Sequence, residues 1–501
     1  YGFKYQEVVF TMKVEVLRKC VGDGLRFIRF QQGVREAEVF ASWNENITIR
    51  INYTSEIPCS GVHEPKSVVS YGVGVLAVFD TPQGIKVGFG SDTGDLTIEG
   101  VKRALERAKK SSVYDPDFKT LPSPSYGSPV LSSYHDGTVM EIGDEEVVYL
   151  GWRALKGALA VFRKKGFMRN LIVGGDVTIL KEKVAVANTN GIDEFDESSS
   201  MFASITAVIE DMNAKGTGWA SATYLNRFRP EEAGNMAAKN AISSAGGRRI
   251  GSGIYNVILG RQAVSMLFSE MIVDALSLDH IDSGNSPFVG KLGQKVASDI
   301  VCVYDDGARP FEVGSKRITC EGIPTGRTDL ISGGRLVGFL SNNYYAKKYE
   351  NNVVKFIPRN GFRFGDEGRD IKRIPSIHAT NLVIEGTREV SSQKLISGIG
   401  NGVYIGRLWY LYPVYGLAKA HFTGTVIGDS YIVRDGQITE PLKPNTVRIN
   451  DNFMSLLKRI VAISRKKSPT LTWGSREVIV APEIAVKCIR LENVAEFIEE
   501  L

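Results

Sequence analysis

Short apolar runs separated by glycine-rich turns fill the second half of this chain. Turn signals occur, for example, at Gly333-Gly334, Asn401-Gly402 and Asp435-Gly436. Glycine favours such turns because it adopts backbone angles that other residues avoid. Apolar runs of this length between turns are typical of β-strands. With 52 glycines in 501 residues, the sequence therefore predicts a strand-rich protein rather than a helical bundle.

The length and a glycine cluster divide the chain. A chain of 501 residues is too long for one ordinary hydrophobic core. Glycines interrupt the sequence between 246 and 253, after an expected helix. We therefore predict an α+β fold with two domains: an N-terminal α/β domain over 12–245 and a β-rich C-terminal domain over 250–501 that carries a central helix. Residues 1–11 precede Met12, a plausible natural start, and are interpreted as an extension.

Hydrophobic periodicity assigns elements to the N-terminal domain. Thr97 is expected to cap one helix, and residues 81–84 to turn a hairpin. A polar turn is expected near Asn44 and Asn46. Helices are expected at 12–30, 97–111, 145–165 and 229–244, and strands at 37–53, 72–79, 85–89, 177–179, 184–187 and 202–209.

Composition argues against several classes of protein. A formal charge of +5 without a concentrated basic stripe does not suit a nucleic-acid binder. No apolar run approaches the roughly 20 residues that cross a bilayer, so no membrane segment is expected. The five cysteines lie far apart without CxxC spacing, which favours reduced thiols and a cytoplasmic location.

The stretch 261–278 is the most informative for function. It reads as one apolar helix, RQAVSMLFSEMIVDALSL, with carboxylates at Glu270 and Asp274 and, just beyond its end, at Asp279 and Asp282. Residues four apart project to one face of a helix, so Glu270 and Asp274 should lie together. They form either the polar edge of an amphipathic helix or an acidic wall that holds a cation or a peptide amine.

Several segments in and around this stretch resemble one family. Residues 321–331 read EGIPTGRTDLI, and residues 429–438 read DSYIVRDGQI. Together with the helix and the glycine-rich segment at 398–406, they resemble the TldD/PmbA family of metallopeptidase-related proteins. The resemblance covers most of the chain and is strongest from about 255 to 450.

The resemblance implies a zinc motif that this chain lacks. In the catalytic TldD branch, a helical HExxxH motif and a later cysteine hold zinc. Here Ser269 and Asp274 stand at the two histidine positions, Glu270 is kept, and Trp473 falls near the cysteine position. Serine and indole are poor zinc ligands. Residues five apart lie about 140° apart around an ideal α-helix, so the motif also requires the helix to end or distort there.

By resemblance, the chain is expected to be the PmbA (TldE)-like, non-catalytic subunit of a heterodimer. Its partner would be a TldD-type zinc peptidase that acts on unfolded or leader-like peptides. The chain would be inactive alone and carry no metal or cofactor, with zinc only in the partner. Candidate peptide-binding residues are Glu270, Asp274, Asp279 and Trp473.

Two alternatives stay open. The chain could form a homo-oligomeric assembly on an old peptidase scaffold, with the aromatic segment Trp409–Tyr415 at the interface. It could also be an enzyme that holds a hard metal at Glu270, Asp274 and Asp279. His280 could substitute as a ligand, although a histidine at a helix exit is more commonly exposed and free of metal.

Overall fold

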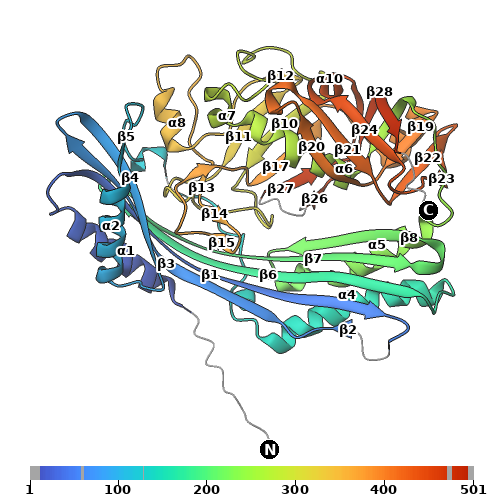
Figure 1. Cartoon of the computed structure of the whole chain (residues 1–501), viewed down its shortest axis with the longest axis horizontal. Coiled ribbons are helices and arrows are strands. Elements are labelled where there is room, and N and C mark those ends of the chain that lie inside the picture. Colours follow the sequence, from blue (N-terminus) through green and yellow to red (C-terminus); the bar gives the residue numbers. More distant parts are fainter. Residues whose placement is uncertain (1–11, 58–60, 128, 471–476, 495–501) are drawn as a thin grey trace, which may run out of the picture.

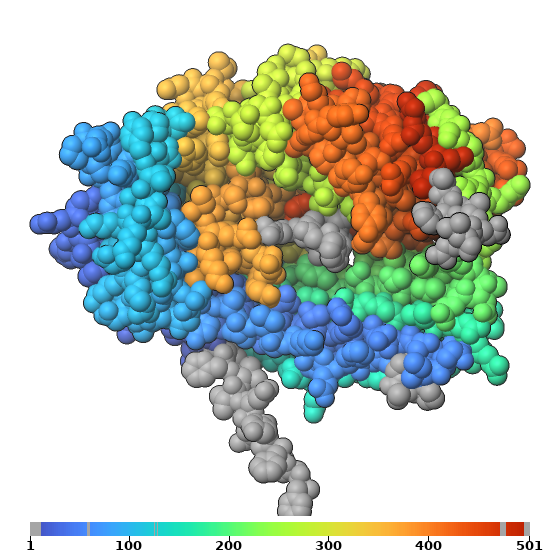
Figure 2. All heavy atoms as spheres, in the orientation of Figure 1, coloured from blue at the N-terminus to red at the C-terminus, as the bar shows by residue number. Residues whose placement is uncertain are grey.

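The computed structural model describes residues 12–57, 61–127, 129–470 and 477–494. It has two parts (Figure 1): a long curved sheet from the N-terminal half, and a layered C-terminal half that covers one face of this sheet. Space-filling atoms show the two halves in close contact along the sheet (Figure 2). The α+β class and the two-domain arrangement agree with the prediction, while the boundary near 245–250 stays a prediction.

The N-terminal sheet is antiparallel and runs in the order β5-β4-β3-β1-β6-β7-β8, with β2 beside β1. Among the described strands, β8 pairs only with β7 and forms one edge. The strands are β1 Val34–Thr54, β2 Gly61–Val62, β3 Lys66–Thr81, β4 Gly84–Thr93, β5 Val113–Tyr114, β6 Leu171–Asn188, β7 Asp193–Ile209 and β8 Ala214–Ala222.

The two faces of this sheet have different partners because side chains alternate along a strand. Val39 and Ala41 belong to a core under α1 and α2, and Ile49 to a core under α4 and α5. Phe40 points the other way, into a cluster with Ile318 and other residues of the C-terminal half. The helices are α1 Val14–Ile28, α2 Ile98–Ser111, the short α3 Gly137–Met140, α4 Asp144–Lys164 and α5 Pro230–Ser243. The four long ones confirm the predicted helices, and the Thr97 side chain caps α2.

The predicted turn near Asn44 and Asn46 is wrong. Strand β1 continues through both residues, and its pairing with β3 and β6 stays in register there. Asn44 is buried, and its Nδ2 donates to the carbonyl oxygen of Arg369 at 2.9 Å. The polar residue therefore serves a contact with the C-terminal half. The runs predicted at 177–179 and 184–187 are likewise parts of the single strand β6.

Two larger sheets and two short hairpin-like pairs make up the described C-terminal half. The ten-stranded sheet has the order β20-β21-β24-β28-β9-β19-β22-β23, with β18 and β25 beside it, and the six-stranded sheet the order β12-β11-β10-β17-β27-β26. The ten strands are β9 Gly253–Leu259, β18 Glu389–Val390, β19 Gly402–Ile405, β20 Leu408–Val414, β21 His421–Val426, β22 Ser430–Arg434, β23 Gln437–Pro441, β24 Val447–Asn452, β25 Ile460–Ser464 and β28 Ile484–Asn493.

The six-stranded sheet and the helices complete this half. Its strands are β10 Val301–Asp306, β11 Arg327–Ser332, β12 Arg335–Leu336, β17 Asn381–Gly386, β26 Ser468–Thr470 and β27 Val478–Ala481. The short pairs are β13 Gly361–Phe362 with β16 Ser376–Ile377, and β14 Phe364–Gly365 with β15 Gly368–Arg369. The helices are α6 Arg261–Leu267, α7 Leu278–Asp282, α8 Asn343–Lys348, α9 Ser392–Ile399 and α10 Phe453–Lys458.

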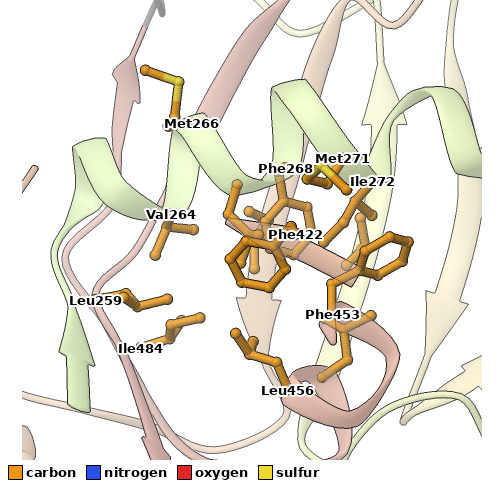
Figure 3. Close-up of a cluster of buried hydrophobic side chains, with 14 of the residues drawn as sticks. Leu259, Val264, Met266, Phe268, Met271, Ile272, Phe422, Phe453, Leu456 and Ile484 are labelled. Carbon is orange, nitrogen blue, oxygen red and sulfur yellow. The ribbon is translucent and has the colours of Figure 1, made fainter. Parts of the chain in front are cut away.

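The central helix, which begins with α6 and covers the stretch 261–278, lies in the largest hydrophobic core of the described residues. Figure 3 shows Val264 and Phe268 of this helix pointing toward Phe422 and Ile484 of the ten-stranded sheet. Leu267, Phe268, Met271 and Ile272 are all buried. The same core includes residues of the six-stranded sheet such as Ile384 and Ile479, so the helix is packed between elements of both sheets. Packing on several sides fixes the orientation of the side chains that follow Leu267.

Buried ion pairs join the two halves. Lys316 Nζ lies 2.6 Å from Glu182 Oε2 of β6, and Arg369 Nη1 lies 2.7 Å from Asp196 Oδ2 of β7. All four side chains are almost completely buried. Burial alone would raise the pKa of Glu182, but Lys316 and Arg369 more than offset it and lower this pKa to about 2. Buried ion pairs therefore hold the two halves together, and removing one member of a pair would leave the other charge buried without a partner.

Candidate functional site

The central helix changes its geometry where the family motif falls. It is α-helical to Leu267, forms a π-helical turn over Phe268–Ile272, and continues as a 3₁₀ turn over Asp274–Leu276. The amide of Val273 accordingly donates to the carbonyl of Phe268, five residues earlier, at 2.9 Å. The prediction of one regular helix over 261–278 is wrong. The predicted distortion is confirmed, and such π turns are frequent at functional sites.

Ser269 is buried on this turn, and its hydroxyl donates to Oε1 of Glu477. Glu477 directly precedes β27, the strand of the six-stranded sheet that lies beside α6. Glu477 was not predicted as a site residue, because it lies 208 residues from Ser269 and the local pattern around 477 carries no signal for this contact. At the position of the first motif histidine, the side chain is thus engaged with a carboxylate.

Glu270 and Asp274 both reach solvent. Protein atoms surround their remaining sides, and this partial burial raises the pKa of each carboxyl. The neighbouring carboxylates Glu477 and Asp274 raise the pKa of Glu270 further. For Asp274, His280 opposes the rise and Asp279 adds to it. Asp274 therefore lies near Glu270 on one side and near Asp279 on the other, while a peptide-binding role for the three carboxylates stays a prediction.

These residues do not fit a zinc ion. Within the described part of the chain, no group of three or more His, Cys, Asp or Glu side chains could hold a metal. The proposed hard-metal set of Glu270, Asp274 and Asp279 is not such a group either. His280 lies near Asp274, and its Nδ1 faces the Nδ2 of Asn285 at 3.4 Å. Trp473 lies outside the described residues, so its place near the site stays a prediction.

The aromatic segment at 409–415 lies at a sheet edge and packs its buried side against the central helix and its π-helical turn. Most of it forms β20, the outermost strand of the ten-stranded sheet. Leu408 and Leu411 are buried, while Tyr410, Tyr412 and Tyr415 are exposed. The segment is therefore a surface strand with projecting tyrosines, a geometry compatible with an interface.

In the described part of the chain, no helix is both long enough and apolar enough to cross a membrane.

Two domain models of one family match the chain. The PmbA/TldA metallopeptidase central domain matches residues 154–245, and the PmbA/TldA metallopeptidase C-terminal domain matches residues 252–493. Among sequence relatives, an uncharacterized protein from Methanocaldococcus jannaschii is 24% identical over 79% of this chain and 85% of its own length. A metalloprotease TldD homolog from Buchnera aphidicola is 22% identical over 83% of this chain and 86% of its own length.

Solved structures share the fold. The crystal structure of TldE from Thermococcus kodakarensis matches with a TM-score of 0.77 and 19% identity, over 94% of this chain and 100% of that one. At this identity the similarity establishes the architecture. The domain models, the relatives and the architecture all point to the same family as the resemblance carried by residues 321–331 and 429–438. The chain belongs to the TldD/PmbA family of metallopeptidase-related proteins.

Proposed function

We propose that the chain is the non-catalytic subunit of a TldD/TldE-type metallopeptidase complex. In this role it completes the peptide-binding chamber and takes no part in the hydrolytic step itself. The observation that carries the proposal is the hydrogen bond from Ser269 to Glu477 at the position of the first motif histidine. A catalytic zinc needs three protein ligands and an open position for water. The Ser269 hydroxyl, which is hydrogen-bonded to the Glu477 carboxylate, does not supply a zinc ligand.

The partner would be a family member that retains HExxxH and holds zinc. Hydrolysis of a peptide bond at neutral pH requires an activated water and a polarised carbonyl, and zinc supplies both in such enzymes. Glu270 alone offers only a carboxylate, with its pKa raised by burial and by Glu477 and Asp274. The acid groups at 270, 274 and 279 would instead receive the amino group of a peptide. Trp473 remains a further candidate for this contact.

Co-expression with an HExxxH-bearing homologue from the same organism tests this proposal. With an affinity tag on this chain only, we expect the homologue to co-purify and the pair to cleave unfolded peptides. A chelator should abolish cleavage, and either subunit alone should be inactive. The matched control replaces the motif glutamate of the homologue with glutamine, which should leave assembly intact and stop cleavage. Peptidase activity of this chain by itself would overturn the proposal.

A second candidate is a homo-oligomeric assembly, favoured by β20. This strand ends the path of the ten-stranded sheet; its Tyr410 is 72% exposed, and Tyr415, just after its end, is 84% exposed. Exposed, unpaired strand edges readily pair with a second chain. Mass photometry of the purified chain separates the two candidates. A discrete homo-oligomer that persists when the HExxxH homologue is added would favour this second function over the first.

A further inference from the structure

A cavity lies between the two halves, beside the start of the central helix. It has a volume of about 570 Å³. The N-terminal half contributes β8 and α5, and the C-terminal half contributes the start of α6 and residues around β26. In Figure 1, β8 is the strand of the curved sheet that lies next to β26. The cavity therefore opens beside a sheet edge.

The backbone of β8 is only partly paired at this edge. In an antiparallel pair, alternate residues direct their N–H and C=O groups away from the neighbouring strand. Hydrogen bonds from side chains identify the residues of β8 whose backbone groups point away from β7. The carbonyl of Lys215 accepts from Ser244 Oγ, and the carbonyl of Thr217 accepts from Asn240 Nδ2, both at 2.9 Å. Asp429 accepts from the amide and the hydroxyl of Thr217.

The same alternation places the N–H and C=O groups of Trp219 and Ser221 on the outward side. Both residues line the cavity. Among the hydrogen bonds of the described residues, no side chain covers these groups as Ser244, Asn240 and Asp429 cover those before them. Two outward residues of an edge strand thus present their backbone to an open space. This is the geometry to which an extended peptide adds by strand pairing.

Cationic side chains surround this part of the cavity. Arg227, Arg229, Arg261 and Lys466 all line it, and in the described chain none of them has a carboxylate within 4.0 Å. Arg227 lies over the Phe311 ring at 3.8 Å, a cation–π contact that holds it at the cavity wall. Arg229 Nη1 donates to the carbonyl of Phe228 at 3.1 Å and Arg261 Nη1 to the hydroxyl of Ser468 at 3.4 Å, so both guanidinium groups have neutral partners. Guanidinium groups without a carboxylate partner are suited to receive a carboxylate from a ligand.

Three carboxylates share the lining, and two of them have uncovered oxygens. Glu232 is exposed on α5. Asp429 and Glu483 are more than nine-tenths buried, and Oδ1 of Asp429 and Oε2 of Glu483 have no hydrogen-bond partner in the described chain. The other oxygen of Glu483 accepts from the Tyr404 hydroxyl at 3.0 Å. Buried acceptors without a protein partner can accept hydrogen bonds from the N–H groups of a ligand.

We propose that this cavity binds the carboxylate-bearing end of an extended peptide, which pairs with Trp219 and Ser221 of β8 while Arg229 and Arg261 receive its carboxylate. The peptide backbone supplies the N–H donors that the buried carboxylates lack. The carboxylate is either the free C terminus or an acidic side chain near it. The cavity would be a subsite of the proposed peptide-binding chamber. This inference rests on the proposed function, because that function supplies the peptide ligand.

Fluorescence anisotropy with the full chain tests the site. The probe is a hexapeptide of alternating threonine and valine, labelled at its amino end, with a free C-terminal carboxylate. A second probe is the same peptide as a C-terminal amide, and a third is the amide with one glutamate near the end. We expect the free acid to bind at least about tenfold more tightly than the amide, since hydrogen bonds to charged groups are the stronger ones. Tight binding of the third probe would identify a side chain as the carboxylate source.

Three variants locate the contact. Arg229→Gln and Arg261→Gln should each weaken binding of the free-acid peptide about tenfold and leave binding of the amide peptide unchanged. Arg248→Gln is the matched control, because Arg248 pairs with Glu440 at 2.7 Å and does not line the cavity. Ser221→Pro removes an outward N–H, which an edge strand tolerates, so peptide binding should fall while the melting temperature is kept.

Equal binding of acid and amide, unchanged binding by the Ser221→Pro chain, or no binding of any probe at millimolar concentration would each overturn the proposal. The failure of the proposed function is separable. If co-expression with the HExxxH homologue gives an active pair whose peptide cleavage ignores Arg229→Gln and Arg261→Gln, only the subsite is wrong. If no active pair forms although these variants lose peptide binding, the subunit role fails and the peptide site stands.

Discussion

The hydroxyl of Ser269 donates a hydrogen bond to the carboxylate of Glu477, which follows 208 residues later in the chain. The contact joins the π-helical turn of the central helix to the start of β27. The resemblance to the family's zinc-binding members puts a motif histidine at position 269. In this chain the same position stabilises the packing of helix against sheet.

Ser269→Ala tests this structural role. The hydroxyl is buried and bonded to a carboxylate, so its loss should lower the free energy of unfolding by about 2 kcal/mol. Ser265→Ala is the matched control on the same helix, because its hydroxyl donates to the neutral carbonyl of Thr470 at 3.3 Å. The control should cost about 1 kcal/mol or less in urea denaturation. Equal losses in the two variants would argue against a special contact at 269.

The ion pair between Lys316 and Glu182 should hold the two halves together. Lys316→Met leaves a buried carboxylate without its nearest cation, and we expect a loss of about 3 kcal/mol or more in the free energy of unfolding. The double variant with Glu182→Gln should recover part of this loss, since it removes the stranded charge. Urea denaturation followed by circular dichroism measures both. A single variant as stable as the wild type would show that the pair contributes nothing.

Glu321 should make stability fall as the pH rises. The side chain is buried, and burial, followed by the nearby Glu38, raises its pKa to about 8, against the backbone N–H of Asn343. Since the folded-state pKa lies above the unfolded value, the protonated carboxyl contributes stability below about pH 4.5. This contribution is lost as the pH rises through 8. Each unit of pKa shift corresponds to about 1.4 kcal/mol.

Glu321→Gln keeps a neutral group at this place and should flatten the decline. Urea denaturation at pH 6 and pH 9 compares the variant with the wild type, and Glu350→Gln on the surface is the control for a lost charge. The wild type and the control should both lose stability between the two pH values, and Glu321→Gln should lose less. The same decline in all three chains would contradict the assignment.

Local patterns predicted most of the N-terminal fold. Periodicity located the four long helices and the 72–89 hairpin, because the helices bury one face against the sheet and the hairpin buries one face against α1 and α2. It failed at Asn44, where a polar residue inside a strand resembled a turn. The amide of Asn44 bonds to the carbonyl of Arg369, 325 residues away, and a local pattern does not contain that partner.

The candidate site was predictable only in part. The five-residue spacing of Ser269 and Asp274 required a distorted helix, and the π turn supplies it. The sequence did not reveal Glu477 or the cavity beside β8. Both depend on packing between segments far apart in the chain: Glu477 contacts the central helix through the six-stranded sheet, and Trp219 and Arg261 line the cavity from the two halves.

Zinc content of the isolated chain tests the central claim most directly. The chain would be purified without chelator, equilibrated with zinc, desalted and analysed by mass spectrometry, beside an HExxxH-bearing family member treated in the same way. We predict stoichiometric zinc in that relative, and neither stoichiometric zinc nor peptide cleavage in this chain. One zinc per chain, retained by the wild type and lost on substitution of Glu270 or Asp274, would contradict the account.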